Sequence, residues 1–83
     1  MSRTLREPIP LETIRAVRAA LIQDKSLSIY AKNVQILSEG DRIVLRGRVR
    51  SENERQRVQN IAARVAGMAR VRNDLDVDVV KAR

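Results

Sequence analysis

The sequence predicts an α+β fold, a two-layer sandwich with the element order αββαβ. Two segments repeat apolar residues at spacings of three and four, as one face of a helix does, and three segments alternate apolar and polar residues, as half-buried strands do. Two such helices and a sheet with a single apolar face pack most economically when both helices cover that face. We therefore expect a three-stranded mixed sheet with two helices on one face.

The first helix follows a polar, basic lead-in of residues 1–9. The domain itself is expected to span residues 10–80, followed by a tail of residues 81–83. The helix is expected to begin near Pro10, because proline lacks an N–H that would be unpaired in the first helical turn anyway. An apolar stripe then runs over roughly four turns, and its members are Leu11, Ile14, Val17 and Leu21.

The next two segments predict a β-hairpin. Residues 33–38 and 42–50 alternate, and Gly40–Asp41 supplies turn chemistry between them. A two-residue loop pairs residues whose numbers sum to 81, which sets Ile36 opposite Leu45. A slip of one residue would mix the apolar and polar faces, so this register is predicted.

A second helix begins at Ser51, which Glu54 follows three residues later in the pattern of a capping box. In that motif the serine side chain accepts the backbone N–H of the glutamate, and the glutamate side chain accepts the backbone N–H of the serine. Gly67 is expected to end the helix, because glycine readily adopts the left-handed conformation of a helix stop. Its apolar positions are Val58, Ile61, Ala62 and Val65.

The third strand explains a row of arginines on the second. A right-handed crossover places it parallel to and beside the second strand, with Leu75, Val77 and Val79 facing inward. Asp74, Asp76 and Asp78 then lie near Arg46, Arg48 and Arg50. Neighbouring opposite charges contribute ~0.2–1 kcal/mol per pair. We interpret the arginines as half of a structural charge ladder, and the aspartates weaken the alternative, a dedicated anion site.

Composition excludes most catalytic chemistry. The 83 residues include no histidine and no cysteine, the commonest general base and frequent metal ligands. No phosphate-binding glycine motif is present, and the serines have no base to activate them. The aspartates of the third strand lack the 6–8 convergent oxygens of a Ca²⁺ site. We therefore expect a protein that is not an enzyme and that holds no metal or cofactor.

These motifs together resemble the BON domain, the bacterial osmotically-inducible and nodulation domain. "IVLRGRV" supplies Ile43, Leu45, Gly47 and Val49, and "VAGMARVRNDL" supplies Val65, Gly67, Val71, Asn73 and Leu75. The resemblance covers about residues 14–79. Two positions depart from the family pattern: Asp41 stands where a glycine is usual, and Met68 replaces a valine.

The resemblance implies a non-catalytic binding module of the bacterial envelope. Such modules bind phospholipid surfaces or proteins, and some relatives are linked to osmotic stress, secretion pores or channels. The matched residues are implied to be structural. Gly47 would let a helix pack closely on the sheet, Gly67 would stop the helix, and Asn73 would cap or turn the chain at the strand entry.

The excess charge favours an anionic partner. The chain has 17 basic and 10 acidic residues, a formal charge of +7. The candidate contacts with an anionic surface are Arg15, Arg18, Arg57 and Arg64. Ile22 lies beside the first two, and Asn60 lies between the last two. We expect association with anionic phospholipid, with an envelope protein or with further copies of the chain.

The alternative is a small basic nucleic-acid-binding protein, although the single aromatic residue, Tyr30, offers no stacking platform. The first ten residues hold no apolar signal-peptide core. We therefore expect a periplasmic or envelope-associated domain if an export signal has been removed, and a cytoplasmic one otherwise.

Overall fold

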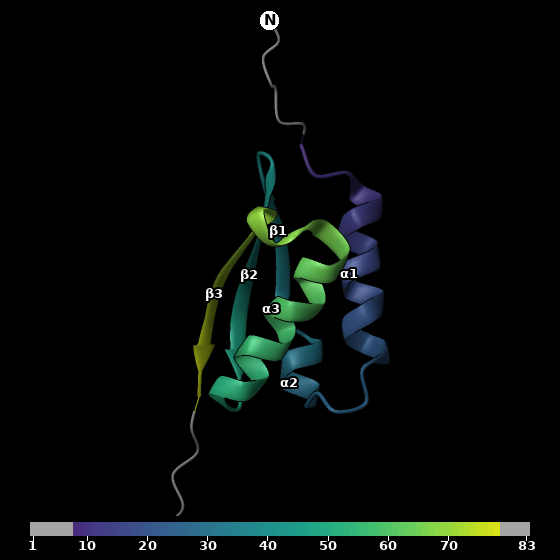
Figure 1. Cartoon of the computed structure of the whole chain (residues 1–83). Coiled ribbons are helices and arrows are strands. Elements are labelled where there is room, and N and C mark those ends of the chain that lie inside the picture. The colour runs from purple at the N-terminus through teal and green to yellow at the C-terminus, as the bar shows by residue number, and fades with distance from the viewer. Residues whose placement is uncertain (1–7, 79–83) are drawn as a thin grey trace, which may run out of the picture.

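The computed structural model describes residues 8–78, which form two layers (Figure 1). Two long helices lie side by side over one face of a three-stranded sheet (Figure 1). The helices are α1 (Leu11–Gln23) and α3 (Glu52–Ala66), and the strands are β1 (Gln35–Glu39), β2 (Arg42–Val49) and β3 (Val71–Val77). The predicted αββαβ sandwich is confirmed.

Two short helical elements were not predicted. The one-turn helix α2 (Ile29–Lys32) follows Ser28, whose hydroxyl accepts a hydrogen bond from the Ala31 N–H at 3.3 Å. The 3-10 turn η1 (Met68–Arg70) joins α3 to β3. Segments of three or four residues are too short to show an apolar period, so periodicity cannot detect them.

The sheet has the order β1–β2–β3, and its registers match the prediction. β1 and β2 are antiparallel, with Ile36 opposite Leu45, as the two-residue turn requires. β3 runs parallel to β2, with Arg46 opposite Asp74 and Arg48 opposite Asp76. The central strand is therefore β2, and β1 and β3 form the two edges.

The core lies between the helices and the sheet. Its buried members include Val17, Leu21, Ile43, Leu45, Val49, Val58, Ile61, Ala62 and Leu75. Two residues of the predicted apolar stripes are not buried, so their prediction is wrong: Leu11 is 60% exposed and Val65 is 38% exposed. Leu11 is the first residue of α1, where Ile9 before the helix packs into the core, and Val65 lies in the last turn of α3, where Ala66 packs against the core instead. Val79, also expected to face inward, lies outside the described residues.

The two rows of the charge ladder lie side by side in the sheet, but among residues 8–78 a single ion pair joins them. The Arg48 guanidinium contacts the Asp78 carboxylate at 3.5 Å, and both side chains are exposed. Asp74 instead pairs with Arg72 of its own strand at 3.2 Å. Arg50 lies beyond the end of β2 and places its guanidinium 5.5 Å from the centre of the Tyr30 ring. Exposed ion pairs contribute only ~0–1 kcal/mol each, so the ladder adds little to stability.

The start of α3 corrects the predicted capping box. Ser51 caps the helix as expected, since its hydroxyl accepts the Glu54 N–H at 3.1 Å. The reciprocal bond is different: the Glu54 carboxylate accepts the N–H of Arg50 at 2.9 Å. It also accepts two hydrogen bonds from Ser28, far away in sequence. Glu54 therefore joins α3 to α2 as well as capping its own helix.

Candidate functional site

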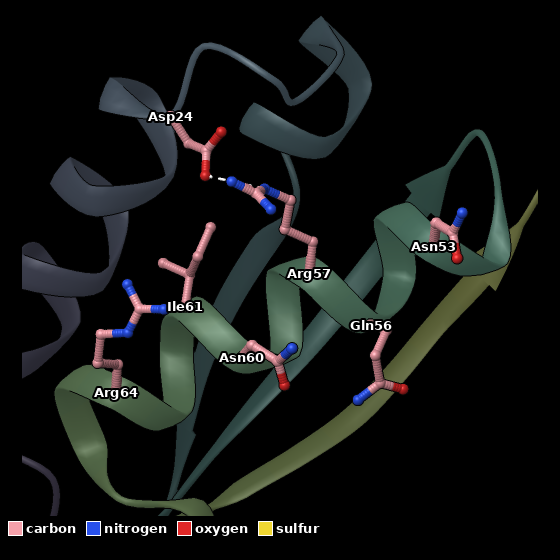
Figure 2. A pocket seen from close by; sticks show the side chains of 7 residues that line it. All are labelled: Asp24, Asn53, Gln56, Arg57, Asn60, Ile61 and Arg64. Atoms are coloured by element: carbon pink, nitrogen blue, oxygen red, sulfur yellow. Dashed lines mark hydrogen bonds and ion pairs between the residues drawn. The ribbon is translucent and has the colours of Figure 1, made fainter.

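A groove runs along the exposed side of α3 (Figure 2). Its volume is about 440 Å³, and we call it the α3 groove. One of its lining residues follows the end of α1, and the others belong to α3 (Figure 2). They are Asp24, Asn53, Gln56, Arg57, Asn60, Ile61 and Arg64. The groove thus brings together two of the four arginines that the sequence singled out.

Helical spacing places the polar side chains of the α3 groove on one side. Asn53, Arg57, Asn60 and Arg64 follow one another at steps of four, three and four residues. Residues at these steps are neighbours on a helix surface. Ile61 is buried beneath them, at 7% exposure, and packs into the core. Carboxamide and guanidinium groups therefore alternate along the groove, above the buried Ile61 side chain.

Asp24 lies at one end of the α3 groove, just after α1. Its Oδ2 contacts the Arg57 Nε at 3.0 Å, and its Oδ1 accepts the Ser26 hydroxyl at 2.6 Å and the Ser26 N–H at 2.8 Å. The Ser26 hydrogen bonds, followed by the Arg57 guanidinium, hold the pKa of the Asp24 carboxyl below its ordinary value. Asp24 is therefore ionised at neutral pH and offsets part of the charge of Arg57.

Arg64 differs from Arg57 in its surroundings. It is exposed, and no ion pair or hydrogen bond joins its guanidinium to another residue between positions 8 and 78. Figure 2 shows its side chain beside Ile61, on the far side from the Arg57–Asp24 pair. The α3 groove therefore offers an anion one unengaged guanidinium and one that is partly engaged.

The other two candidate arginines lie on a different flank. Leu11, Arg15, Arg18 and Ile22 follow one another along α1 at steps of four, three and four residues, and we call them the α1 stripe. Neither Arg15 nor Arg18 lines the α3 groove. Arg15 is exposed, whereas Arg18 is half-buried and donates to the Lys32 carbonyl at the end of α2, at 3.0 Å. The four candidate arginines thus lie on two surfaces, two on each.

The α1 stripe combines charge with exposed aliphatic groups. Leu11 is 60% exposed at its start, and Ile22 is 54% exposed near its end. Arg15 and Arg18 lie between them along the helix. Arg18 stabilises the last turn of α2, because a cation near a helix C-terminus interacts favourably with the carbonyls there. Arg15 is therefore the residue of the stripe whose guanidinium is most available to a partner.

The role implied for Gly47 is partly wrong. The sequence led us to expect a helix over this position, but the three atoms nearest to an added Cβ would all belong to Val34, starting with its Cα at 3.3 Å. Gly47 has φ +136°, a conformation that other residues rarely adopt. It therefore allows the backbone before β1 to approach β2 closely. Gly67 ends α3 with φ +97°, as predicted.

Asn73 connects β3 to α3 and does not turn the chain at the strand entry. Its amide nitrogen donates to the Gln59 side chain at 2.9 Å and to the Arg55 carbonyl at 3.3 Å, and its oxygen accepts the Leu75 N–H at 3.0 Å. The Arg55 side chain donates to the Leu75 carbonyl at 3.2 Å. Both backbone groups of Leu75 at the β3 edge are therefore satisfied by side chains.

Sequence reasoning missed Asp24, Asn53 and Gln56 as groove residues. Asn53 and Gln56 carry a signal that could have been found, since they share the helical spacing of Arg57 and Asn60. Asp24 carries none, because 33 residues separate it from Arg57 and only the packing of α1 on α3 brings the two together.

Within residues 8–78 no group of three or more acidic, histidine or cysteine side chains could hold a metal ion. None of the helices in this part of the chain has the length and apolar character that crossing a bilayer requires. The described residues thus form a small α+β domain with a polar groove on α3 and a charged and aliphatic stripe on α1.

Comparison with known families matches residues 12–79 to the BON domain, so the chain belongs to the BON domain family. BON domains are non-catalytic binding domains, and membership indicates an envelope-associated binding module. A search of the curated proteins found no match to the chain.

Proposed function

We propose that this BON domain binds the anionic phospholipid surface of a bacterial envelope membrane. The observation that carries the proposal is the α1 stripe, in which Leu11 and Ile22 are exposed on either side of the exposed Arg15. Aliphatic groups that enter the headgroup boundary, next to cations that attract anionic lipid, are the pattern of an interfacial helix. We further propose a periplasmic or envelope location and a role under osmotic or envelope stress.

The magnitude of the attraction supports weak and reversible binding. Each basic residue near an anionic membrane contributes ~1 kcal/mol, and the attraction fades within a Debye length of ~8 Å at physiological salt. The formal charge of +7 supplies the long-range attraction. The exposed aliphatic residues supply the contribution that salt does not screen.

Nucleic-acid binding is the alternative that draws on the same charge. Single-stranded nucleic acids are held by aromatic stacking as well as by cations. Tyr30 is the one aromatic residue of the chain, and the Arg50 guanidinium lies over its ring at 5.5 Å. The structure therefore favours lipid over nucleic acid, and an envelope protein or a further copy of the chain is the remaining class of partner.

Co-sedimentation with vesicles tests the proposal. We expect binding to vesicles rich in phosphatidylglycerol or cardiolipin at low salt, little binding to phosphatidylcholine vesicles, and loss of most binding at several hundred millimolar salt. Equal binding to anionic and neutral vesicles at low salt would reject the proposal and leave protein–protein contact as the better explanation. A single-stranded oligonucleotide that binds more tightly than anionic vesicles at the same salt would favour the alternative.

A further inference from the structure

We propose that the α3 groove is a headgroup site that holds the phosphoglycerol part of an anionic phospholipid. This inference rests on the proposed function and goes further, because it assigns one lipid chemistry to one set of side chains. Arg57 and Arg64 take the phosphodiester, and the carboxamides of Asn53, Gln56 and Asn60 take the glycerol hydroxyls. The groove and the α1 stripe then contribute separately to membrane binding.

The arginines of the α3 groove provide donors for the phosphate. They are seven residues apart, or ~10.5 Å along the helix axis, and they belong to the same helical stripe. The Arg57 Nε is engaged with Asp24, which leaves the terminal nitrogens of its guanidinium. The Arg64 guanidinium contacts no acidic group of the described residues. Guanidinium groups suit phosphate oxygens because their N–H groups donate in a planar fork.

The carboxamides of the α3 groove indicate a ligand with hydroxyl groups. A side-chain amide both donates and accepts hydrogen bonds, and so does a hydroxyl. A phosphate oxygen only accepts, so phosphate recognition alone would not call for three amides beside two arginines. A glycerol joined to a phosphodiester matches both kinds of group. A choline headgroup offers no hydroxyl and carries a cation that the arginines repel.

The charge of the α3 groove suits a monoanion. Two arginines and one aspartate line it, which leaves a net charge of +1. A phosphodiester carries a single negative charge and balances it. The groove volume of about 440 Å³ falls within the ~300–1,000 Å³ range of small-ligand sites. Its mainly polar lining is suited to a headgroup rather than to an acyl chain.

Asp24 sets the affinity of the α3 groove by competing for Arg57. Its carboxylate holds the Arg57 Nε at 3.0 Å and repels an incoming phosphate. The substitution Asp24→Asn keeps an oxygen for the Ser26 hydrogen bonds and removes the negative charge. We expect this variant to bind the headgroup about threefold to tenfold more tightly, because the repulsion between the Asp24 carboxylate and the phosphate is removed. A variant that bound less because its structure was damaged would change the affinity in the opposite direction.

The test uses the full chain and a soluble headgroup. The arginine Nε–H signals of Arg57 and Arg64 are followed by NMR during titration with glycerophosphoglycerol, inorganic phosphate and dibutanoyl phosphatidylcholine, a soluble phosphodiester without a free hydroxyl, at the same low salt. We expect saturable shifts of both signals with glycerophosphoglycerol and none that saturate with dibutanoyl phosphatidylcholine. Asn60→Ala should weaken glycerophosphoglycerol binding and leave phosphate binding unchanged. Arg48 serves as an internal control on the sheet face, and its signal should not shift.

The outcomes separate this inference from the proposed function. Vesicle binding without saturable headgroup shifts at Arg57 and Arg64 overturns the groove assignment and leaves the membrane proposal standing. Equal affinity for glycerophosphoglycerol and dibutanoyl phosphatidylcholine, or weaker binding by the Asp24→Asn variant, also overturns it. Phosphate that binds as tightly as glycerophosphoglycerol would show a phosphate site without headgroup recognition. If the headgroup shifts are intact but anionic vesicles do not bind, the membrane proposal and the lipid as source of the headgroup are rejected, and the groove assignment stands.

Discussion

The Glu54 carboxylate of α3 accepts two hydrogen bonds from Ser28, the residue that caps α2. Its Oε2 accepts the Ser28 N–H at 2.6 Å, and its Oε1 accepts the Ser28 hydroxyl at 2.9 Å. The same Oε1 accepts the N–H of Arg50 at 2.9 Å. One negative charge thus lies at the N-terminal ends of two helices, where helix dipoles favour an anion. The contact fixes the position of α2 relative to α3.

We predict that Glu54→Gln lowers the free energy of unfolding by ~1.5–3 kcal/mol at neutral pH, the value of hydrogen bonds to a charged group. Burial raises the pKa of Glu54, but the hydrogen bonds from Ser28 and Arg50 outweigh it and leave the pKa lowered. A lowered pKa means stability that is present above the ordinary glutamate pKa of about 4.3 and lost as the pH falls through the folded-state value. Thermal melts at pH 7 and pH 3 should therefore show a difference between the two proteins that becomes smaller in acid.

Glu52→Gln is the matched control for that series. Glu52 lies in the same first turn of α3, and its exposed carboxylate contacts the Arg55 guanidinium at 3.0 Å. We expect its substitution to change stability by less than ~1 kcal/mol, as for other exposed ion pairs. Equal effects of the two substitutions would show that the contact with Ser28 adds nothing beyond the helix dipole.

We predict that Gly47→Ala destabilises the domain by ~1–3 kcal/mol, the range for a residue held in a rare backbone conformation. The methyl group would meet the Val34 Cα at 3.3 Å, and φ +136° disfavours any Cβ. Gly40→Ala is the control, because it places a Cβ at φ +62° with no neighbour within 4 Å. A melting temperature for Gly47→Ala equal to that of Gly40→Ala would show that the contact with Val34 costs nothing.

Hairpin register and strand order could be predicted because they follow from patterns that repeat along the chain. A slip of one residue would have placed Ile36 against Val44 and reversed the faces, so few alternatives remained. The parallel placement of β3 followed from the handedness of the crossover and from the alternating charges of β2 and β3.

The contacts that build the α3 groove and fasten α2 could not be predicted in this way. Glu54 and Ser28 are 26 residues apart, and Asp24 and Arg57 are 33 apart. Neither pair leaves a periodic signal, because each depends on how two helices pack in three dimensions. The division of the four candidate arginines between two surfaces follows from the same packing, since Arg18 turns to the end of α2.

We predict that Asn73→Ala lowers the free energy of unfolding by ~1–3 kcal/mol, because a backbone N–H and carbonyl lose their partners. The Leu75 N–H loses its acceptor, and the Arg55 carbonyl and the Gln59 side chain lose a donor. The edge of β3 also becomes available for pairing with other chains. Urea unfolding measures the first effect and light scattering the second. Asp76→Ala, on the outer face of the same strand, should leave both measurements unchanged.

The last prediction separates the two contributions of the α1 stripe. Arg15→Gln should weaken binding to phosphatidylglycerol vesicles about fivefold at low salt, the equivalent of ~1 kcal/mol for one cation near the surface. The effect should be largely lost at several hundred millimolar salt, where the Debye length falls to ~4–5 Å. Ile22→Ser removes an aliphatic group that is 54% exposed, so its effect should persist at both salt concentrations.

The controls for this series lie away from α1. Arg48→Gln removes a cation of the sheet face whose charge Asp78 already offsets, so vesicle binding should change less than with Arg15→Gln. Met68→Ser removes a side chain that is 67% exposed in η1, and it should leave binding unchanged. If Arg48→Gln weakens binding as much as Arg15→Gln, overall charge and not the α1 stripe governs the interaction. If Ile22→Ser has no effect at either salt concentration, the helix rests on the headgroups by charge alone, without inserting its aliphatic residues.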